Sequence, residues 1–167
     1  MKRQRDSTLN IQQTDGQTGR GAAAAASRFC RSHNNGEGED FMVIIPDKGV
    51  LELDLNGSWE FLGEEPGRVV QVPGDLHALG VSVVTDKEYE YRRQLTVPEE
   101  FRGKRIFLEL ASIHDDTEII INKKTAAVNR IPYMDCRIEL TQLLTPGETA
   151  DLTLRCISRS DSLSSSP

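Results

Sequence analysis

From Phe41 to Ile157 the sequence consists of short apolar stretches, rich in β-branched residues, that are separated by proline and glycine. This pattern is typical of short strands joined by turns. In Arg105–Ala111 and Ala150–Ile157 every second residue is apolar, which places these side chains on one face of each strand. The stretches that predict strands are Met42–Ile45, Val50–Leu55, Ser58–Leu62, Arg68–Val72, Glu88–Val97, Arg105–Ala111, Glu118–Asn122, Ala126–Asn129, Cys136–Leu140 and Ala150–Ile157.

Turn residues separate these stretches, and no long helical period interrupts them. Turn chemistry is present at Pro46–Gly49, Glu64–Gly67, Pro73–Gly74 and Thr145–Gly147. Many short strands without long helices predict an all-β fold, a β-sandwich. Helix is expected only in two fragments, Gly74–Leu79 and a turn at Pro98–Arg102.

The two ends of the chain differ from this central part. Residues 1–40 are rich in small and polar residues, with an alanine run at Ala22–Ala26, and residues 158–167 are rich in serine. Such segments cannot offset the roughly 1–2 kcal/mol per residue that backbone ordering costs. We therefore expect one domain over residues 41–157 between two disordered tails. A helix over the alanines is the alternative, but it would be too short to be stable alone.

Composition restricts the classes of partner. A net charge of −6 argues against nucleic acid, whose binding requires clustered Lys and Arg. No apolar run reaches the roughly 18–20 residues of a membrane span, and the N-terminal region lacks the apolar stretch of a secretory signal, so a cytoplasmic location is the default expectation. Cys30, Cys136 and Cys156 are odd in number and lack metal-ligand spacing, so neither a disulfide framework nor a zinc site is expected.

Four segments carry motifs. Leu55–Phe61 has the pattern L-x-G-x-W-x-F, and Val72–His77 begins with V-P-G. Tyr91–Leu108 has Y-R-R before a V-P turn and G-K-R after it, and Ile119–Glu148 ends with L-T-x-L-L-T-P-G-E. In this order and spacing, the segments resemble the N-terminal sugar-binding domain of glycoside hydrolase family 2, the family of β-galactosidase, β-glucuronidase and β-mannosidase.

The resemblance covers roughly Val50–Cys156 and implies a jelly-roll β-sandwich of the galactose-binding-domain-like type. In complete enzymes of this family the sandwich stands beside an immunoglobulin-like domain and a catalytic (β/α)₈ barrel that hydrolyses O-glycosyl bonds in carbohydrate metabolism. The resemblance therefore implies a domain of a glycosidase without its barrel, which we expect to be inactive alone. A stand-alone carbohydrate-binding or protein-interaction module is the alternative.

The motif residues also have structural interpretations. Trp59 and Phe61 lie two apart, so both are expected in the core. Arg92 and Arg93 must face opposite sides of their strand, and the inward one needs a carboxylate partner, for which Glu109 and Asp116 are both candidates. Where the family has an Asn-Gly turn, this chain has Asn122-Lys123, so the turn is expected to be longer or strained.

Catalytic groups are not expected in this chain. Retaining glycoside hydrolysis uses two carboxylates about 5–5.5 Å apart. In family 2 these are glutamates of the barrel, whereas Glu64-Glu65 and Glu99-Glu100 are typical of solvated turns. The three histidines are isolated, His114–Asp116 is more typical of a turn than of a metal site, and no cofactor is expected.

If this surface contacts a β-glycoside, four loop residues are the candidates. Asp86 precedes the Tyr-Arg-Arg strand, where it resembles in placement a polar residue of β-galactosidase relatives, and Asn129, Arg130 and Tyr133 lie in a loop that diverges from the family. Ordinary solvated loop residues are the alternative interpretation. The partners expected are a carbohydrate and the barrel domain. One wall of a pocket lacks the concavity that buries a ligand, so simple sugars should bind weakly to the isolated chain.

Overall fold

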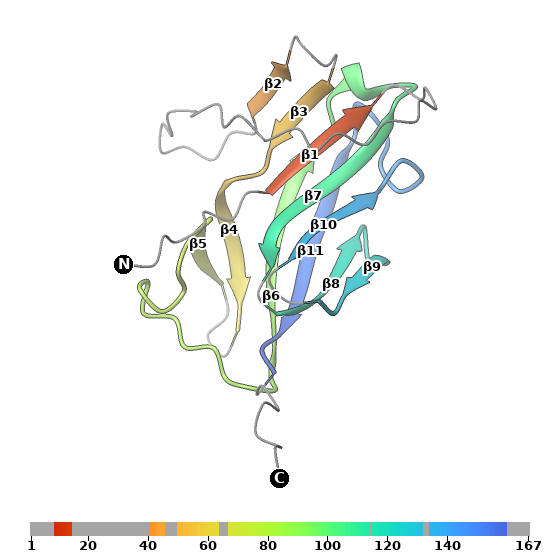
Figure 1. The fold of residues 1–167 in the computed structure, drawn as a ribbon. Helices are drawn as coiled ribbons and strands as arrows, with labels where there is room; N and C mark the ends of the chain where they lie inside the picture. Colours follow the sequence, from red (N-terminus) through yellow and green to blue (C-terminus); the bar gives the residue numbers. More distant parts are fainter. Residues whose placement is uncertain are drawn as a thin grey trace.

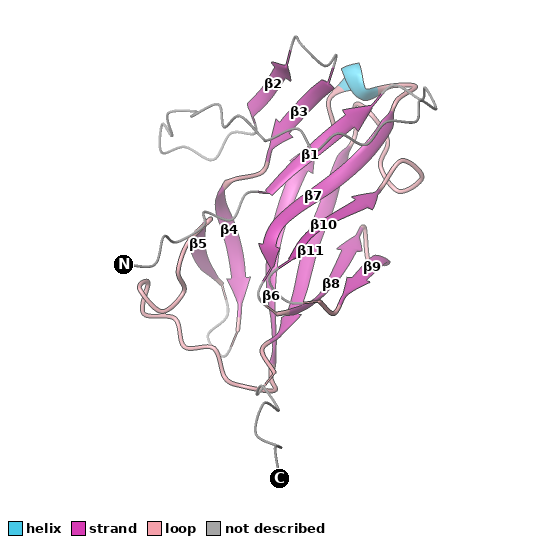
Figure 2. Cartoon of the chain, viewed as in Figure 1, coloured by secondary structure: helices cyan, strands magenta, loops and turns pink. Residues whose placement is uncertain are grey.

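The computed structural model describes residues 9–14, 41–45, 50–63, 67–113, 115–131 and 134–159. Within these ranges the elements are strands and one 3₁₀ turn, η1 (Glu99–Phe101) (Figure 2). The strands are β1 (Leu9–Thr14), β2 (Phe41–Ile45), β3 (Val50–Asp54), β4 (Gly57–Leu62), β5 (Arg68–Val72), β6 (Glu88–Thr96), β7 (Arg105–Ile113), β8 (Asp116–Ile121), β9 (Lys124–Asn129), β10 (Met134–Glu139) and β11 (Thr149–Ile157).

The strands form two antiparallel sheets. One has the order β10-β7-β1-β3-β2 and the other has the order β5-β4-β6-β11-β8-β9. In Figure 1 the sheet that contains β1 and β7 lies in front of the sheet that contains β6 and β11, so the two form a sandwich. The predicted all-β sandwich is confirmed, and each stretch predicted to be a strand coincides with one of β2–β11.

The hydrophobic core lies between the two sheets. The alternating residues Ile106, Leu108 and Leu110 of β7 are buried, as are Leu152 and Leu154 of β11, and all belong to one cluster. Burying such a side chain contributes about 1.5–3 kcal/mol relative to an exposed position. The alternation in the sequence therefore reports which face of each strand packs inward.

The aromatic residues of the L-x-G-x-W-x-F motif belong to this core, as predicted. Trp59 is 1% exposed, and its indole Nε1–H donates to the carbonyl oxygen of Leu55 at 2.9 Å. The ring centroid of Phe61 lies 5.7 Å from that of Tyr89 and 5.4 Å from that of Tyr91. These three rings pack together on the inner side of β4 and β6.

Arg93 faces inward from β6, while its neighbour Arg92 faces outward. Nη1 of Arg93 donates to the carbonyl oxygens of Leu55 at 2.7 Å and Asn56 at 3.1 Å. The guanidinium carbon also lies 6.0 Å from the centroid of the Trp59 ring. Arg93 therefore ties the middle of β6 to the turn between β3 and β4.

The two carboxylates considered as partners for the inward arginine have other arginines beside them. Glu109 pairs with Arg137 at 3.2 Å, and Asp116 pairs with Arg159 at 2.6 Å. Glu109 alternates with the buried leucines of β7, so it faces the outer side of the opposite sheet. The hydrogen bonds given above for Arg93 are accepted by backbone carbonyl oxygens at the end of β3 and in the turn that follows it.

β1 corrects the expectation that residues 1–40 are disordered throughout. Leu9–Thr14 pairs with β3 through Ile11 and Leu53 and with β7 along its whole length. These backbone partners are distant in sequence, and local composition does not reveal such pairing. The other residues of the expected N-terminal tail lie outside the described residues.

The first two residues of the expected C-terminal tail, Ser158 and Arg159, lie within the described residues. The carbonyl oxygen of Ser158 accepts the backbone N–H of Asp86 at 2.8 Å, and Arg159 pairs with Asp116. Both residues therefore contact the end of the sandwich. Residues 160–167 lie outside the described residues.

One of the two expected helix fragments is wrong. Residues 74–79 form turns in which Oδ1 of Asp75 accepts the backbone N–H of His77 at 2.8 Å and of Ala78 at 3.3 Å. Gly80, with φ of +69°, ends the segment before a helix can form. The second fragment is confirmed as the 3₁₀ turn η1.

The turn between β8 and β9 is strained rather than longer. It has two residues, Asn122 and Lys123, with φ of +48° and +67°. Asn122 is held by two bonds to Asp151 of β11, because its N–H donates to the Asp151 carbonyl oxygen and its Oδ1 accepts the Asp151 N–H, both at 2.9 Å. The strain is therefore concentrated at Lys123, since asparagine tolerates this conformation better than lysine.

Replacing Lys123 by glycine should stabilise the protein by about 0.5–1 kcal/mol, because glycine removes the left-handed strain but adds freedom to the unfolded chain. Urea denaturation measures this change. Lys124→Gly is the matched control, since Lys124 is a strand residue where glycine should destabilise. Equal effects of the two substitutions would contradict the strained turn.

Candidate functional site

Three of the four residues predicted to contact sugar, Asp86, Asn129 and Arg130, are described, and they lie at one end of the sandwich. Asp86, with φ of +61°, precedes β6, and its backbone is fixed by Ser158. Asn129 ends β9, and its side-chain amide makes two bonds of 3.2 Å with the backbone of Ile131. Arg130 follows and is exposed, whereas Tyr133 lies outside the described residues.

Strand register brings Asp86 and Asn129 to the same end of the six-stranded sheet. Asn129 pairs with Thr117 of β8, and Asp116 pairs with Ile157 of β11, whose next residue holds Asp86. β11 and β8 lie between the two predicted residues, so they do not form one compact cluster. Their role in sugar binding stays a prediction.

An ion pair occupies the middle of this end. Nε of Arg159 lies 2.6 Å from Oδ2 of Asp116. The hydrogen bond to Asp116 raises the pKa of Arg159, and the charge of Asp86 adds to this effect. The centre of this end therefore carries a persistent cation between two carboxylates.

A second surface was not identified from the sequence. It is a depression of about 760 Å³ on the outer face of the six-stranded sheet, which we call the outer-face depression. Thr153 of β11 lies on its floor, with Arg92 of β6 as its cross-strand neighbour on one side and Ile120 of β8 on the other. The residues that line it are Glu60, Glu90, Arg92, Arg93, Gln94, Ile120, Lys123, Thr125, Asp151, Leu152, Thr153 and Arg155.

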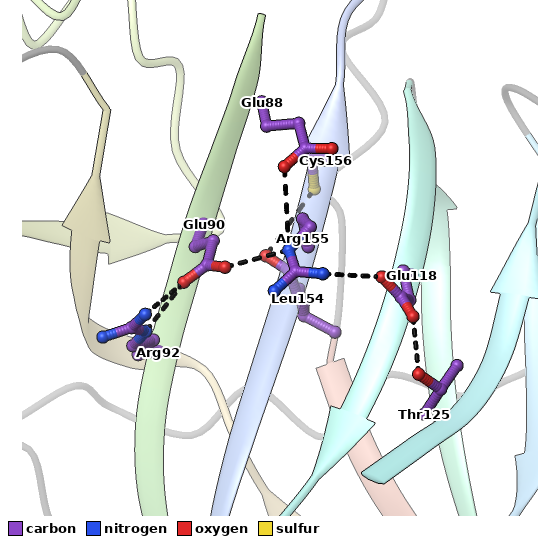
Figure 3. A network of polar contacts seen from close by, with 8 residues as sticks. All are labelled: Glu88, Glu90, Arg92, Glu118, Thr125, Leu154, Arg155 and Cys156. Carbon is purple, nitrogen blue, oxygen red and sulfur yellow. Dashed lines mark hydrogen bonds and ion pairs between the residues drawn. The ribbon is translucent and has the colours of Figure 1, made fainter. Parts of the chain in front are cut away.

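A network of charged side chains crosses this face (Figure 3). Arg155 is its centre: Nε lies 3.0 Å from Oε1 of Glu90, and Nη1 lies 3.0 Å from Oε2 of Glu118. Nε of Arg92 donates to Oε2 of Glu90 at 2.8 Å, and the hydroxyl of Thr125 donates to Glu118 at 2.6 Å. The network therefore links four neighbouring strands, β6, β11, β8 and β9.

The arginines fix the ionisation of this network. Partial burial acts to raise the pKa of Glu90, but hydrogen bonds from Arg155 and Arg92 outweigh it and lower the pKa. A glycosidase acid must hold a proton near neutral pH, which requires a raised pKa. Glu90 therefore suits a structural or binding role and does not suit general acid catalysis.

Among the described residues, no group of three or more His, Cys, Asp or Glu side chains is placed to hold a metal ion. The same part of the chain contains no helix with the length and apolar character needed to cross a membrane.

Comparison with known proteins gives a likeness in structure alone. No family model matches the chain, and no curated protein matches it. Among solved structures, it is similar to the β-D-glucuronidase of Dictyoglomus thermophilum, at 17% identity and a TM-score of 0.51, over 62% of this chain and 19% of that one. It is also similar to the β-glucuronidase of Ruminococcus gnavus, at 15% identity and a TM-score of 0.57, over 62% of this chain and 21% of that one.

This chain thus spans about a fifth of the length of these enzymes. At such low identity the likeness concerns the fold and does not extend to substrate or activity. The chain therefore has an all-β sandwich fold that is also found in one part of β-glucuronidases.

Proposed function

We propose that this chain is the sugar-binding β-sandwich domain of a family 2 glycoside hydrolase and that it acts without catalysing hydrolysis itself. The observation that carries the proposal is the shared fold with part of two β-glucuronidases, in a chain whose sequence motifs resemble the same family. The two lines of support differ in kind, because one rests on backbone geometry and the other on residue patterns.

The motif residues support the proposal because they hold the sandwich together. Trp59 and Phe61 are buried, and Arg93 bonds the turn at Leu55. The glycines of G-K-R and P-G-E, Gly103 and Gly147, have φ of +74° and +86°, which favours glycine over other residues. These residues therefore stabilise the core and the turns of the sandwich.

The role that we propose is structural support of an active site on a separate catalytic barrel. The end of the sandwich with Asp86, Asn129 and Arg130 would form part of the wall around a bound β-glycoside. A catalytic barrel would supply the acid and the nucleophile. Glu90 of the outer face does not suit the role of the acid, because hydrogen bonds from arginine lower its pKa.

The purified chain should show no turnover of chromogenic β-galactosides, β-glucuronides or β-mannosides. The physical reason is that retaining hydrolysis needs an acid and a nucleophile at fixed separation, and we assign neither to this chain. Activity that copurifies with the chain through several columns and is lost in a single carboxylate variant would contradict the prediction.

The proposed role is tested through the DNA beside the coding region. We expect a reading frame for a (β/α)₈ barrel next to it, and we expect the barrel to be more active when it is joined to this chain than when it is expressed alone. The absence of such a frame would favour the alternative, a stand-alone carbohydrate-binding module. The outer-face depression favours this alternative, because it offers a candidate binding surface that does not require a barrel.

A further inference from the structure

We propose that the outer-face depression binds an extended, neutral oligosaccharide across the six-stranded sheet. The inference deepens the proposed function, on which it rests for the ligand class, and it places the sugar on a different surface from the predicted end loops. It is carried by three properties of the depression: its shape, its charge balance and its remaining hydrogen-bond donors.

The shape follows from the order of side chains across the sheet. Thr153 is short, and Ile120 beside it is 9% exposed, so the middle of the face is low. Longer side chains surround it, with Arg92 and Gln94 on β6 and Arg155 further along β11. Short side chains in the middle of an open sheet, with longer side chains around them, form a shallow groove. Such a groove fits an extended ligand better than a compact one.

The charges of the lining nearly cancel. Arg155 and Arg92 share Glu90, and Gln94 donates to Asp151 at 2.9 Å. Fixed pairs of this kind leave little net field to attract an ion, whereas unpaired charge of one sign would do so. A neutral ligand that both donates and accepts hydrogen bonds fits this surface better than an anion or a cation.

The arginines still have donors to offer. A guanidinium carries five N–H groups. The hydrogen bonds shown by the described residues use Nε and Nη1 of Arg155, and Nε and Nη2 of Arg92. The remaining N–H groups can donate to sugar hydroxyls, which can in turn donate to the carboxylates of Glu60 and Asp151 in the same lining.

A protein partner fits this surface less well. Protein interfaces are centred on exposed aromatic or large apolar anchors in a desolvated core. The lining contains no aromatic residue, and its two apolar members are largely covered, since Leu152 is 0% exposed. The lack of a stacking ring also means that sugar binding should be weak, with a Kd of about 1 mM.

The test is titration of the full, isotope-labelled chain with β-1,4-linked tetrasaccharides of glucose, mannose and xylose, followed through its amide signals. The charged tetramer of galacturonic acid is the comparison ligand. We expect at least one neutral sugar to shift the signals of Ile120 and Thr153, and to do so at lower concentration than the charged one. No shift with any neutral sugar, stronger binding of the charged sugar, or shifts confined to Asp86 and Asn129 would overturn the proposal.

Two matched pairs of variants locate the site. Thr153→Tyr fills the floor and should weaken binding at least ~10-fold, whereas Thr149→Tyr, on the same strand and face but outside the lining, should change it less than ~2-fold. Arg92→Gln and Arg105→Gln form the second pair, since their side chains are 50% and 52% exposed and only Arg92 lines the depression. Equal effects within both pairs would overturn the assignment.

The outcome separates this inference from the proposed function. Absence of sugar binding beside an intact barrel frame would remove the outer-face depression as a site and leave the glycosidase role standing. Binding that depends on Thr153 in a chain with no barrel frame nearby would support the site and remove the glycosidase role.

Discussion

Replacing Trp59 by alanine is expected to lower the free energy of unfolding by about 3–5 kcal/mol, the range for truncating a buried aromatic residue. Trp59 is 1% exposed, and it donates a hydrogen bond to the carbonyl oxygen of Leu55. Because small domains are stable by only about 5–15 kcal/mol, the variant should be close to unfolding at ambient temperature.

Urea denaturation followed by far-ultraviolet circular dichroism measures this loss. Trp59→Phe is the control, because it keeps much of the ring volume and removes the indole donor, and it should cost about 1–2 kcal/mol. A thermal midpoint that is unchanged in the alanine variant would contradict a core position and would favour a ring that is available to a ligand.

The second large effect is expected for Arg93→Ala, at about 2–3 kcal/mol, since hydrogen bonds from a charged donor contribute more than neutral ones. Arg93 donates to the carbonyl oxygens of Leu55 and Asn56 from the inner side of β6. Its loss would leave the carbonyl of Asn56 without this donor and would free the turn between β3 and β4.

Arg92→Ala is the matched control, because Arg92 is the next residue on the same strand and faces solvent. Its ion pair with Glu90 has side chains that are 50% and 16% exposed, and exposed pairs contribute about 0–1 kcal/mol. Denaturation of both variants under the same conditions gives the comparison. If Arg92→Ala were the more destabilising of the two, the inward role of Arg93 would be refuted.

The sequence was sufficient for elements whose signal is local. Alternation in β7 and β11 reports burial directly, because successive side chains on a strand face opposite sides. Trp59 and Phe61 could be placed in the core by the same rule. The residue types at Asn122-Lys123 predicted a turn that is either longer or strained, and the positive φ values of both residues decide for strain.

Features that depend on strand partners could not be predicted in this way. Leu9–Thr14 has an unremarkable composition and becomes a strand because β3 and β7 leave backbone groups on either side of it. The hydrogen bonds of Arg93 to the backbone carbonyls of Leu55 and Asn56 belong to this class, because backbone acceptors carry no signal in a sequence.

The arrangement of the candidate site also depends on strand pairing, so the sequence could predict it only in part. The sequence predicts Asp86 and Asn129 from two unrelated loops, and only strand register shows that they share one end of the sheet. The outer-face depression was missed because Arg92, Thr153 and Ile120 read as ordinary residues of a solvated strand face. They become neighbours only when β6, β11 and β8 are aligned.

The position of β11 has a consequence for synthesis on the ribosome. β11 is the last strand among the described residues, yet it lies between β6 and β8 and pairs with β6 from Thr149 to Ile157. Until this segment leaves the exit tunnel, β6 and β8 present open edges, which are prone to pair with other chains. The six-stranded sheet can therefore be completed only after β11 has been translated, and we expect the nascent chain to be more prone to aggregation before that point than after it.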